Sequence, residues 1–352
     1  MNRYELKRGL LSGSGLLRYA WANLRRGIYV FNYHRIGDQR KTEFDPNVFS
    51  SDEVQFTGQI ELLRSHFQII GVRRLLDIIE RGDSIRDSLA MITFDDGYRD
   101  NYDVAFPILR SMEVPAVFFL PSSYIGSNLV PWWDEIVWLV RKTQRPTIDV
   151  PWFENQRIPA TDRVAFACRV LNAFKRSDLN IDTKLEQLRL ATGCRMDFGA
   201  SAELFMTWDQ ARQMRAGGMD IGSHTHSHRI LGHLSPEEQE AELSTSKAVI
   251  EAELGDTIHT IAFPVGGPGT YTSTTQLLAD RCGYKAAFNF IPGVNDKPAR
   301  HPFDLYRIGV DRNAGPDDIR LKVAFAGTPL GAVRPANLLR FVRQAICAIT
   351  KR

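Results

Sequence analysis

The sequence predicts an α/β fold built on a parallel sheet, open or closed into a barrel, because short β-type runs alternate with helical patterns over most of the chain. Seven runs are candidate strands, at residues 28–33, 89–94, 116–120, 219–223, 259–263, 285–290 and 305–310. Capping boxes mark three helix starts, at Ser50 with Glu53, Thr207 with Gln210, and Ser235 with Glu238. Pro236 occupies a first helical position, and Gly82 and Gly255 stand where helix ends are expected.

The length and composition limit the classes of protein to which the chain can belong. The 352 residues can hold two domains, or one large barrel-type domain with an insertion. Lys and Arg number 44 against 41 Asp and Glu, and 43% of the residues are hydrophobic, which is an ordinary globular composition. No apolar run approaches the roughly 20 residues needed to cross a bilayer. Neither end carries the clustered arginines and aromatic residues of a nucleic-acid surface, so we expect no nucleic-acid partner.

Both ends of the chain are basic. The apolar part of the N-terminal stretch is interrupted by Arg18 before it becomes a signal-peptide core, so we expect a basic helical segment over 1–27 and a cytoplasmic protein. Residues 321–352 are predicted to form a basic amphipathic segment. The two segments are suited to peripheral contact with the inner face of an anionic membrane, or they pack on the domain and turn their charges to water. The chain has four cysteines, Cys168, Cys194, Cys282 and Cys347, and their spacing matches no metal site. We therefore expect free thiols in a reducing compartment.

The middle of the chain interrupts the alternation of strands and helices. Residues 28–320 are predicted to form the main domain, but from about 127 to 206 helical patterns and polar loops contain no clear strand. We therefore expect a largely helical insertion over one rim of the sheet.

Two carboxylates follow the second candidate strand. The run 89–94 ends abruptly in Asp95, Asp96, Gly97 and Tyr98. The carboxyl ends of parallel strands are where such folds place their active sites. Neighbouring side chains of a regular strand face opposite ways, so both aspartates enter one pocket only if the chain turns, which Gly97 permits. Alone, this pair is also consistent with a turn or a helix cap.

A histidine cluster follows the fourth candidate strand. The run 219–223 leads directly into His224, Thr225, His226, Ser227 and His228. Neutral imidazoles are preferred ligands of zinc and similar ions, and one carboxylate would complete a three-ligand catalytic site with an open position for water. A structural histidine cluster without metal is the alternative.

In this order, Thr93-Phe-Asp-Asp-Gly97 and His224-Thr-x-x-His228 resemble the first two motifs of the polysaccharide deacetylases, the NodB homology domain of the family-four carbohydrate esterases. The resemblance covers roughly residues 28–311 without the insertion and implies a distorted (β/α)7 barrel, in agreement with the seven candidate strands. It implies Asp95 as general base, and Asp96, His224 and His228 as ligands of one divalent metal ion. Zinc is the first expectation, with cobalt, nickel or manganese as alternatives.

Other parts of the resemblance are incomplete. The segment from Ala262 to Gly266 resembles the third motif, which places Phe263 and Val265 beside the substrate and offers the Val265 N–H to an oxyanion. The arginine of that motif is missing, and we predict that Arg307 reaches Asp95 instead, a structural arginine being the alternative. The late histidine motif that supplies a general acid has no clean match, which leaves His301 and His34 as candidates.

The resemblance implies a metal-dependent hydrolase that removes an acetyl group, N-acetyl before O-acetyl, from a sugar in a polysaccharide, oligosaccharide or glycolipid precursor. Tyr98 and Trp133 are candidate contacts for sugar rings, although the tryptophans of the insertion also suit an anchoring role. Two alternatives stay open: a non-catalytic carbohydrate-binding protein on a degenerate deacetylase fold, and a cyclic-amide hydrolase of the same fold.

Overall fold

The computed structural model describes residues 16–82, 84–196, 204–312 and 314–326. The expectations for residues 1–15, for 327–352 of the basic C-terminal segment and for Cys347 lie outside the described residues. Cys168, Cys194 and Cys282 are free thiols. In the ranges that the structure describes, none of the helices has the length and apolar character to span a membrane.

Seven parallel strands form a distorted barrel, and all seven follow the predicted runs. They are β1 (Gly27–Tyr33), β5 (Ser88–Phe94), β6 (Val117–Leu120), β9 (Asp220–Ser223), β10 (Thr260–Ala262), β11 (Ala286–Phe288) and β12 (Ile308–Gly309). From β1 to β11 each of these strands pairs with the next one along the chain, and β12 pairs with β1; the two-residue strand β4 (Gln68–Ile69) adds to the sheet beside β5. The predicted run 305–310 pairs with two different strands. Leu305 exchanges backbone hydrogen bonds of 2.9 Å with Ala287 and Asn289 of the β11 region, and Ile308 and Gly309 pair with β1. This division closes the row of strands.

The strands are buried on both faces, which explains their continuous apolar sequence. Along β1, Ile28 and Val30 pack among residues of the barrel interior, and Tyr29, Phe31 and Tyr33 pack against the surrounding helices. The interior rows of β1, β5 and β9 turn polar at their carboxyl ends, at Asn32, Asp95 and His224, so polar side chains gather at that mouth of the barrel. The opposite end is closed by α4 (Val72–Arg81), whose apolar residues pack in the interior cluster.

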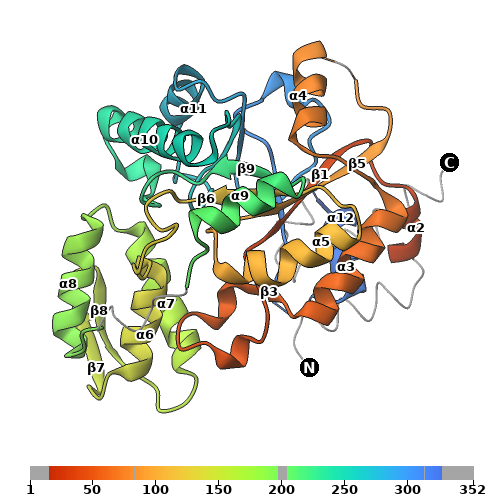
Figure 1. Cartoon of the computed structure of the whole chain (residues 1–352). Helices are drawn as coiled ribbons and strands as arrows, with labels where there is room; N and C mark the ends of the chain where they lie inside the picture. The colour runs from red at the N-terminus through yellow and green to blue at the C-terminus, as the bar shows by residue number, and fades with distance from the viewer. Residues whose placement is uncertain (1–15, 83, 197–203, 313, 327–352) are drawn as a thin grey trace, which may run out of the picture.

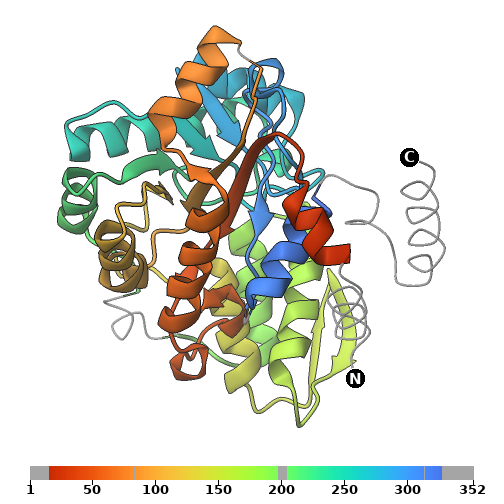
Figure 2. The same cartoon turned by 90° about the vertical axis from the view of Figure 1, so that its right-hand side faces the viewer.

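Helices surround the barrel, as Figures 1 and 2 show. They are α2 (Leu16–Ala22), α3 (Glu53–His66), α4, α5 (Phe106–Ser111), α9 (Trp208–Ala216), α10 (Pro236–Leu254), α11 (Ser273–Arg281) and α12 (Pro316–Ala324). Short helical turns lie at Gln39–Lys41, Pro46–Val48, Asn101–Ala105, Leu231–His233 and Pro298–Arg300, and short strands at β2 (Arg35–Ile36), β3 (Phe49–Ser51) and β4 (Gln68–Ile69).

Most of the predicted helix ends are confirmed, and one is wrong. Capping boxes begin α9 at Thr207 and α10 at Ser235, with Gly82 and Gly255 ending α4 and α10 in the left-handed region. The expected box at Ser50 is instead formed two residues later by Asp52 with Gln55. Ser50 lies in β3, where its hydroxyl accepts a hydrogen bond of 3.0 Å from the His34 N–H.

The insertion is a compact group of elements at one end of the molecule, yellow to green in Figures 1 and 2. It contains α6 (Trp132–Lys142), β7 (Thr147–Val150), β8 (Phe153–Arg157), α7 (Arg163–Arg176) and α8 (Ile181–Thr192). It is largely helical as predicted, but the expectation of no strand is wrong, because β7 and β8 form an antiparallel hairpin. Ile148 and Val150 of β7 point into the insertion's own core, whereas Thr147 and Asp149 face solvent.

Candidate metal centre and active site

A cavity of about 320 Å³ opens at the carboxyl ends of the barrel strands, between the barrel and the insertion. Its lining consists of His34, Asp45, Asn47, Val48, Asp95, Asp96, Trp132, Trp133, Leu171, Lys175, His224, His228, Val265, Phe290 and Arg307. The structure thus brings together residues from both chemical motifs, from the last strand and from the insertion.

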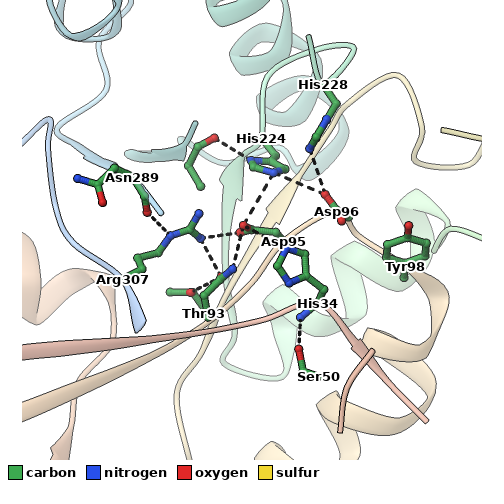
Figure 3. Close-up of polar contacts among 12 residues, drawn as sticks. His34, Ser50, Thr93, Asp95, Asp96, Tyr98, His224, His228, Asn289 and Arg307 are labelled. Carbon is green, nitrogen blue, oxygen red and sulfur yellow. Dashed lines mark hydrogen bonds and ion pairs between the residues drawn. The ribbon is translucent and has the colours of Figure 1, made fainter. Parts of the chain in front are cut away.

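Asp96, His224 and His228 are buried side by side, and one ligand atom of each lies within 4.8 Å of the others. The His224 and His228 Nε2 atoms lie 3.5 and 3.3 Å from the Asp96 Oδ1 atom (Figure 3). Ligands about 2.1 Å from a tetrahedral ion are about 3.4 Å apart. The three side chains therefore have the donor types and the spacing of a zinc-like site.

The surrounding backbone fixes the orientation of the His224 ring. Its Nδ1 atom lies 2.7 Å from the Ala262 carbonyl oxygen, so Nδ1 carries the proton and Nε2 presents a lone pair to the site. Burial lowers the pKa of His224 to about 4, although the Asp95 carboxylate opposes the shift. The imidazole is therefore neutral at pH 7, as a metal ligand must be.

The backbone is strained at the same place. Among the described residues, six non-glycine residues have positive φ, and four of them surround the cavity: Asp96, Thr225, His228 and Val265, with φ of 74°, 66°, 56° and 62°. Positive φ is particularly unfavourable for the β-branched Thr225 and Val265. Strain that is held in this way typically marks a functional site. A Cβ atom on Gly97 would approach the Ile125 side chain to 2.6 Å, so the turn between the two aspartates and Tyr98 requires glycine.

Asp95 is held as a buried carboxylate. Its Oδ1 accepts a hydrogen bond of 2.7 Å from Arg307 Nη1, the contact predicted from the sequence (Figure 3). Its Oδ2 accepts one of 3.1 Å from Asn32 Nδ2. Burial opposes ionisation, but the charge of Arg307 and the hydrogen bond that it donates outweigh this effect and lower the pKa of Asp95 well below its ordinary value. Arg307 is itself fixed by bonds to the Asn289 carbonyl oxygen and to Asn32 Oδ1.

The family model described as polysaccharide deacetylase matches residues 83–287, more than half of the chain. This chain belongs to the polysaccharide deacetylase family. It is 21% identical over 224 residues to YxkH of Bacillus subtilis (strain 168), covering 64% of this chain and 52% of that protein. It is 30% identical over 114 residues to the poly-β-1,6-N-acetyl-D-glucosamine N-deacetylase of Staphylococcus epidermidis, covering 30% of this chain and 39% of that protein. The chain spans about half of the first of these curated relatives and less of the second.

Solved structures share the fold. A Streptococcus pyogenes deacetylase, PplD in complex with acetate, superposes with a TM-score of 0.55 at 17% identity, covering 86% of this chain and 99% of that one. IcaB from Ammonifex degensii gives a TM-score of 0.55 at 17% identity, with 86% and 98% covered. The predicted distorted barrel is thereby confirmed.

Of the two general-acid candidates, His34 is the one that lies in the cavity. It follows β1, its side chain is 28% exposed, and its Nε2 atom lies 3.9 Å from Asp95 Oδ2. The other candidate, His301, is exposed and follows the turn Pro298–Arg300, which packs against α4 at the closed end of the barrel. His301 therefore lies at the wrong end of the barrel, and its prediction as a catalytic residue is wrong.

Two of the expected substrate contacts do not line the cavity. Phe263 is fully buried and stacks on Tyr271, because it follows Ala262 on β10 and so faces the helices rather than the interior. Tyr98 is also fully buried and lies beyond Asp96 in Figure 3. Its hydroxyl donates to Asp134 Oδ2 at 2.8 Å and accepts from Trp133 Nε1 at 2.7 Å. Tyr98 thus joins the barrel to the insertion.

Trp133 and Val265 do line the cavity. The Trp133 ring packs on the His228 ring with centroids 4.2 Å apart, and its bond to Tyr98 also anchors the insertion, so it combines the two roles considered above. Val265 begins the turn after β10, and within the described part of the chain its N–H has no hydrogen-bond acceptor. That N–H is available to an oxyanion.

Sequence analysis missed several polar or aromatic residues of the site, among them Asn32, Asp45, Lys175 and Phe290. Asn32 could have been identified from the sequence, because it is a lone polar residue on the interior side of the otherwise apolar first strand. The other three lie in loops or in the insertion, and no period or motif connects them to the aspartates.

Proposed function

We propose that this protein is a metal-dependent hydrolase that removes an acetyl group, N-acetyl before O-acetyl, from a sugar in a polysaccharide, oligosaccharide or glycolipid precursor. The observation that carries the proposal is the buried Asp96, His224 and His228 triad directly beside an Asp95 carboxylate that is kept ionised by Arg307. A metal triad next to a base can activate water and stabilise the tetrahedral intermediate, and so it suits the hydrolysis of an unactivated acyl group.

The residues divide the work of hydrolysis as follows. Asp96, His224 and His228 would hold one divalent ion, which supplies Lewis acidity at the acyl carbonyl and lowers the pKa of water. Asp95 takes the proton of the attacking water, with its carboxylate oriented by Arg307. The Val265 N–H donates a hydrogen bond to the oxygen that becomes negative in the tetrahedral intermediate. His34, at the exposed side of the cavity, gives a proton to the leaving amine.

The comparison proteins favour an acetylated amino sugar as the substrate. One curated relative is named as acting on poly-β-1,6-N-acetyl-D-glucosamine. We therefore propose N-acetylglucosamine oligosaccharides as the first substrates to test. Zinc is the proposed ion, with cobalt, nickel and manganese as alternatives.

The test is a metal analysis of the purified full-length protein together with acetate release from N- and O-acetylated oligosaccharides, with and without a chelator. One equivalent of metal and chelator-sensitive acetate release are expected. Metal without acetate release from any sugar would favour the cyclic-amide hydrolase. Absence of metal binding would favour the non-catalytic carbohydrate-binding protein.

Cellular location is a separate proposal. We propose a cytoplasmic protein whose basic termini contact the inner face of the membrane. Cell fractionation, followed by sedimentation of the purified protein with anionic vesicles, tests both parts; recovery outside the cytoplasmic and inner-membrane fractions would contradict them.

A further inference from the structure

Two oppositely charged side chains line the same cavity away from the metal triad. Asp45 precedes the short turn Pro46–Val48, and Lys175 lies in the last turn of α7, in the insertion. Within the described ranges, no ion pair connects these two side chains, nor does either of them pair with another charged residue. A carboxylate and an ammonium group thus face one cavity without contact.

Lys175 has no hydrogen-bond acceptor among the residues that the structure describes. Its Nζ atom lies 5.9 Å from the centroid of the Trp132 ring. By contrast, Lys184 of the same insertion donates to two carbonyl oxygens, those of Phe174 and Ser177, at 2.8 Å each. Burial lowers the pKa of Lys175, and the charges of Asp45 and Asp96 only partly oppose the shift. Lys175 is partly buried, and its ammonium group lines the cavity with its hydrogen atoms available to acceptors of a bound molecule.

Hydrogen bonds hold Asp45 in place but involve only one of its two carboxylate oxygens. Its Oδ1 accepts bonds from the Asn47 N–H at 2.9 Å and from Asn47 Nδ2 at 2.8 Å, and its own N–H donates to Asp134 Oδ1 at 3.0 Å. For Oδ2, the described part of the chain offers no donor. Because Asp134 belongs to α6, the insertion fixes both members of the Asp45 and Lys175 pair.

We propose that Asp45 and Lys175 form a subsite that binds a hydroxyl group of the carbohydrate next to its acetylated position. A sugar hydroxyl donates one hydrogen bond and accepts others, so a single group satisfies Asp45 Oδ2 and the Lys175 ammonium together. The cavity volume is at the low end for ligand pockets, so the subsite and the metal triad contact the same sugar or adjacent sugars. This inference deepens the proposed function and rests on it.

The position of Asp45 favours a neutral group over an acidic one at this subsite. The Asp45 carboxylate lines the cavity and, unlike that of Asp95, has no arginine partner among the described residues. A carboxylate or phosphate substituent beside Lys175 would also lie beside Asp45. A hydroxyl group meets no such repulsion, and its recognition by charged partners strongly disfavours an analogue that lacks it.

The test combines turnover with binding. Lys175→Met, Asp45→Asn and a matched control, Arg176→Met, are compared with the wild-type full-length protein on β-1,6-linked N-acetylglucosamine oligosaccharides and on analogues that lack one hydroxyl each. Arg176 is the exposed neighbour of Lys175 on α7, so its substitution removes a charge without touching the cavity. Binding is measured by calorimetry in an Asp95→Asn background, where turnover is expected to be strongly reduced.

We expect Lys175→Met and Asp45→Asn each to lower kcat/KM and the binding constant by about 10- to 100-fold, with unchanged metal content and no effect of Arg176→Met. One deoxy analogue should cost the wild type a similar factor, and Lys175→Met should lose nothing further on it. A structural role would give the same loss on every analogue and would refute the subsite.

Other outcomes also refute the subsite. Wild-type affinity in Lys175→Met, absence of oligosaccharide binding by the wild type, or a loss confined to sugars with a carboxylate or phosphate would each overturn it. Failure of the proposed function gives a different pattern, in which oligosaccharides bind and depend on Lys175 but no acetate is released.

Discussion

The buried pair of Arg307 and Asp95 should dominate the electrostatics of the site, and a double-mutant cycle can measure it. Arg307→Met removes the guanidinium but keeps an apolar side chain of similar length, and Asp95→Asn removes the negative charge but keeps the shape. The two side chains are 1% and 4% exposed, and Arg307 Nη1 lies 2.7 Å from Asp95 Oδ1. Solvent therefore screens this pair very little.

The size of the effect follows from the geometry. Two unit charges about 4 Å apart interact by about 4 kcal/mol at an effective dielectric constant of about 20. Removing one partner of a buried pair costs about 3–5 kcal/mol, since the other charge stays buried and unpaired. Arg307→Met should therefore lower the free energy of unfolding by about 3–5 kcal/mol at pH 7. Adding Asp95→Asn should restore about 2 kcal/mol of this loss, because no unpaired charge then remains.

The assay is urea unfolding at pH 7, followed by circular dichroism, on chelator-treated protein so that metal binding does not contribute. Arg212→Met removes an exposed arginine of α9 and serves as the control, with little change expected. Losses that simply add, within about 0.5 kcal/mol, would show that the two charges are not coupled. The account of Asp95 as a carboxylate held by Arg307 would then be wrong.

Three further predictions concern the same region. Alanine at Asp96, His224 or His228 should abolish stoichiometric metal binding and activity together, and metal analysis that finds full occupancy in all three variants would reject the ligand set. Asp95→Asn should keep the metal and lower kcat by about 10²- to 10⁴-fold, whereas near-normal turnover would exclude it as the base. Burial raises the pKa of Asp134 to about 7, so the folded state holds a proton that the unfolded state releases near its ordinary value of 3.8. In urea titrations from about pH 4 to 7, the stability of the wild type relative to Asp134→Asn should therefore fall by up to about 4 kcal/mol. The comparison cancels the opposite contribution of His224, whose lowered pKa adds stability over the same range in both proteins.

The barrel and its chemical residues were predictable because burial leaves a strong signal. Strands that are covered on both faces appear as continuous apolar runs, and parallel strands deliver the residues after them to one mouth. Asp95 and His224 follow such runs directly, so the sequence alone predicts that they meet. Arg307 could be anticipated as well, since it lies on the interior side of the last run.

The errors have definite physical causes. Phe263 was expected beside the substrate because it belongs to a motif, but strand alternation turns it toward the helices. The hairpin of the insertion has strands of only four and five residues, too short for alternation to stand out. Asp45 and Lys175 are 130 positions apart and come together only because α6 and α7 pack on the barrel mouth.

The residues proposed to perform hydrolysis and those proposed to select the substrate come from different parts of the chain. The groups proposed to perform hydrolysis follow the barrel strands, where they are buried and bonded to one another, as Arg307, Asn32 and Asp95 are. The groups proposed to select the sugar come from the insertion and from the loop before Pro46, which are joined to the barrel by Asp134. Substitutions in the first set should therefore act mainly on kcat, because they change groups that act on the reacting atoms. Substitutions in the second set should act on substrate binding and on the choice of sugar, so a different insertion on the same barrel would keep the reaction and change its substrate.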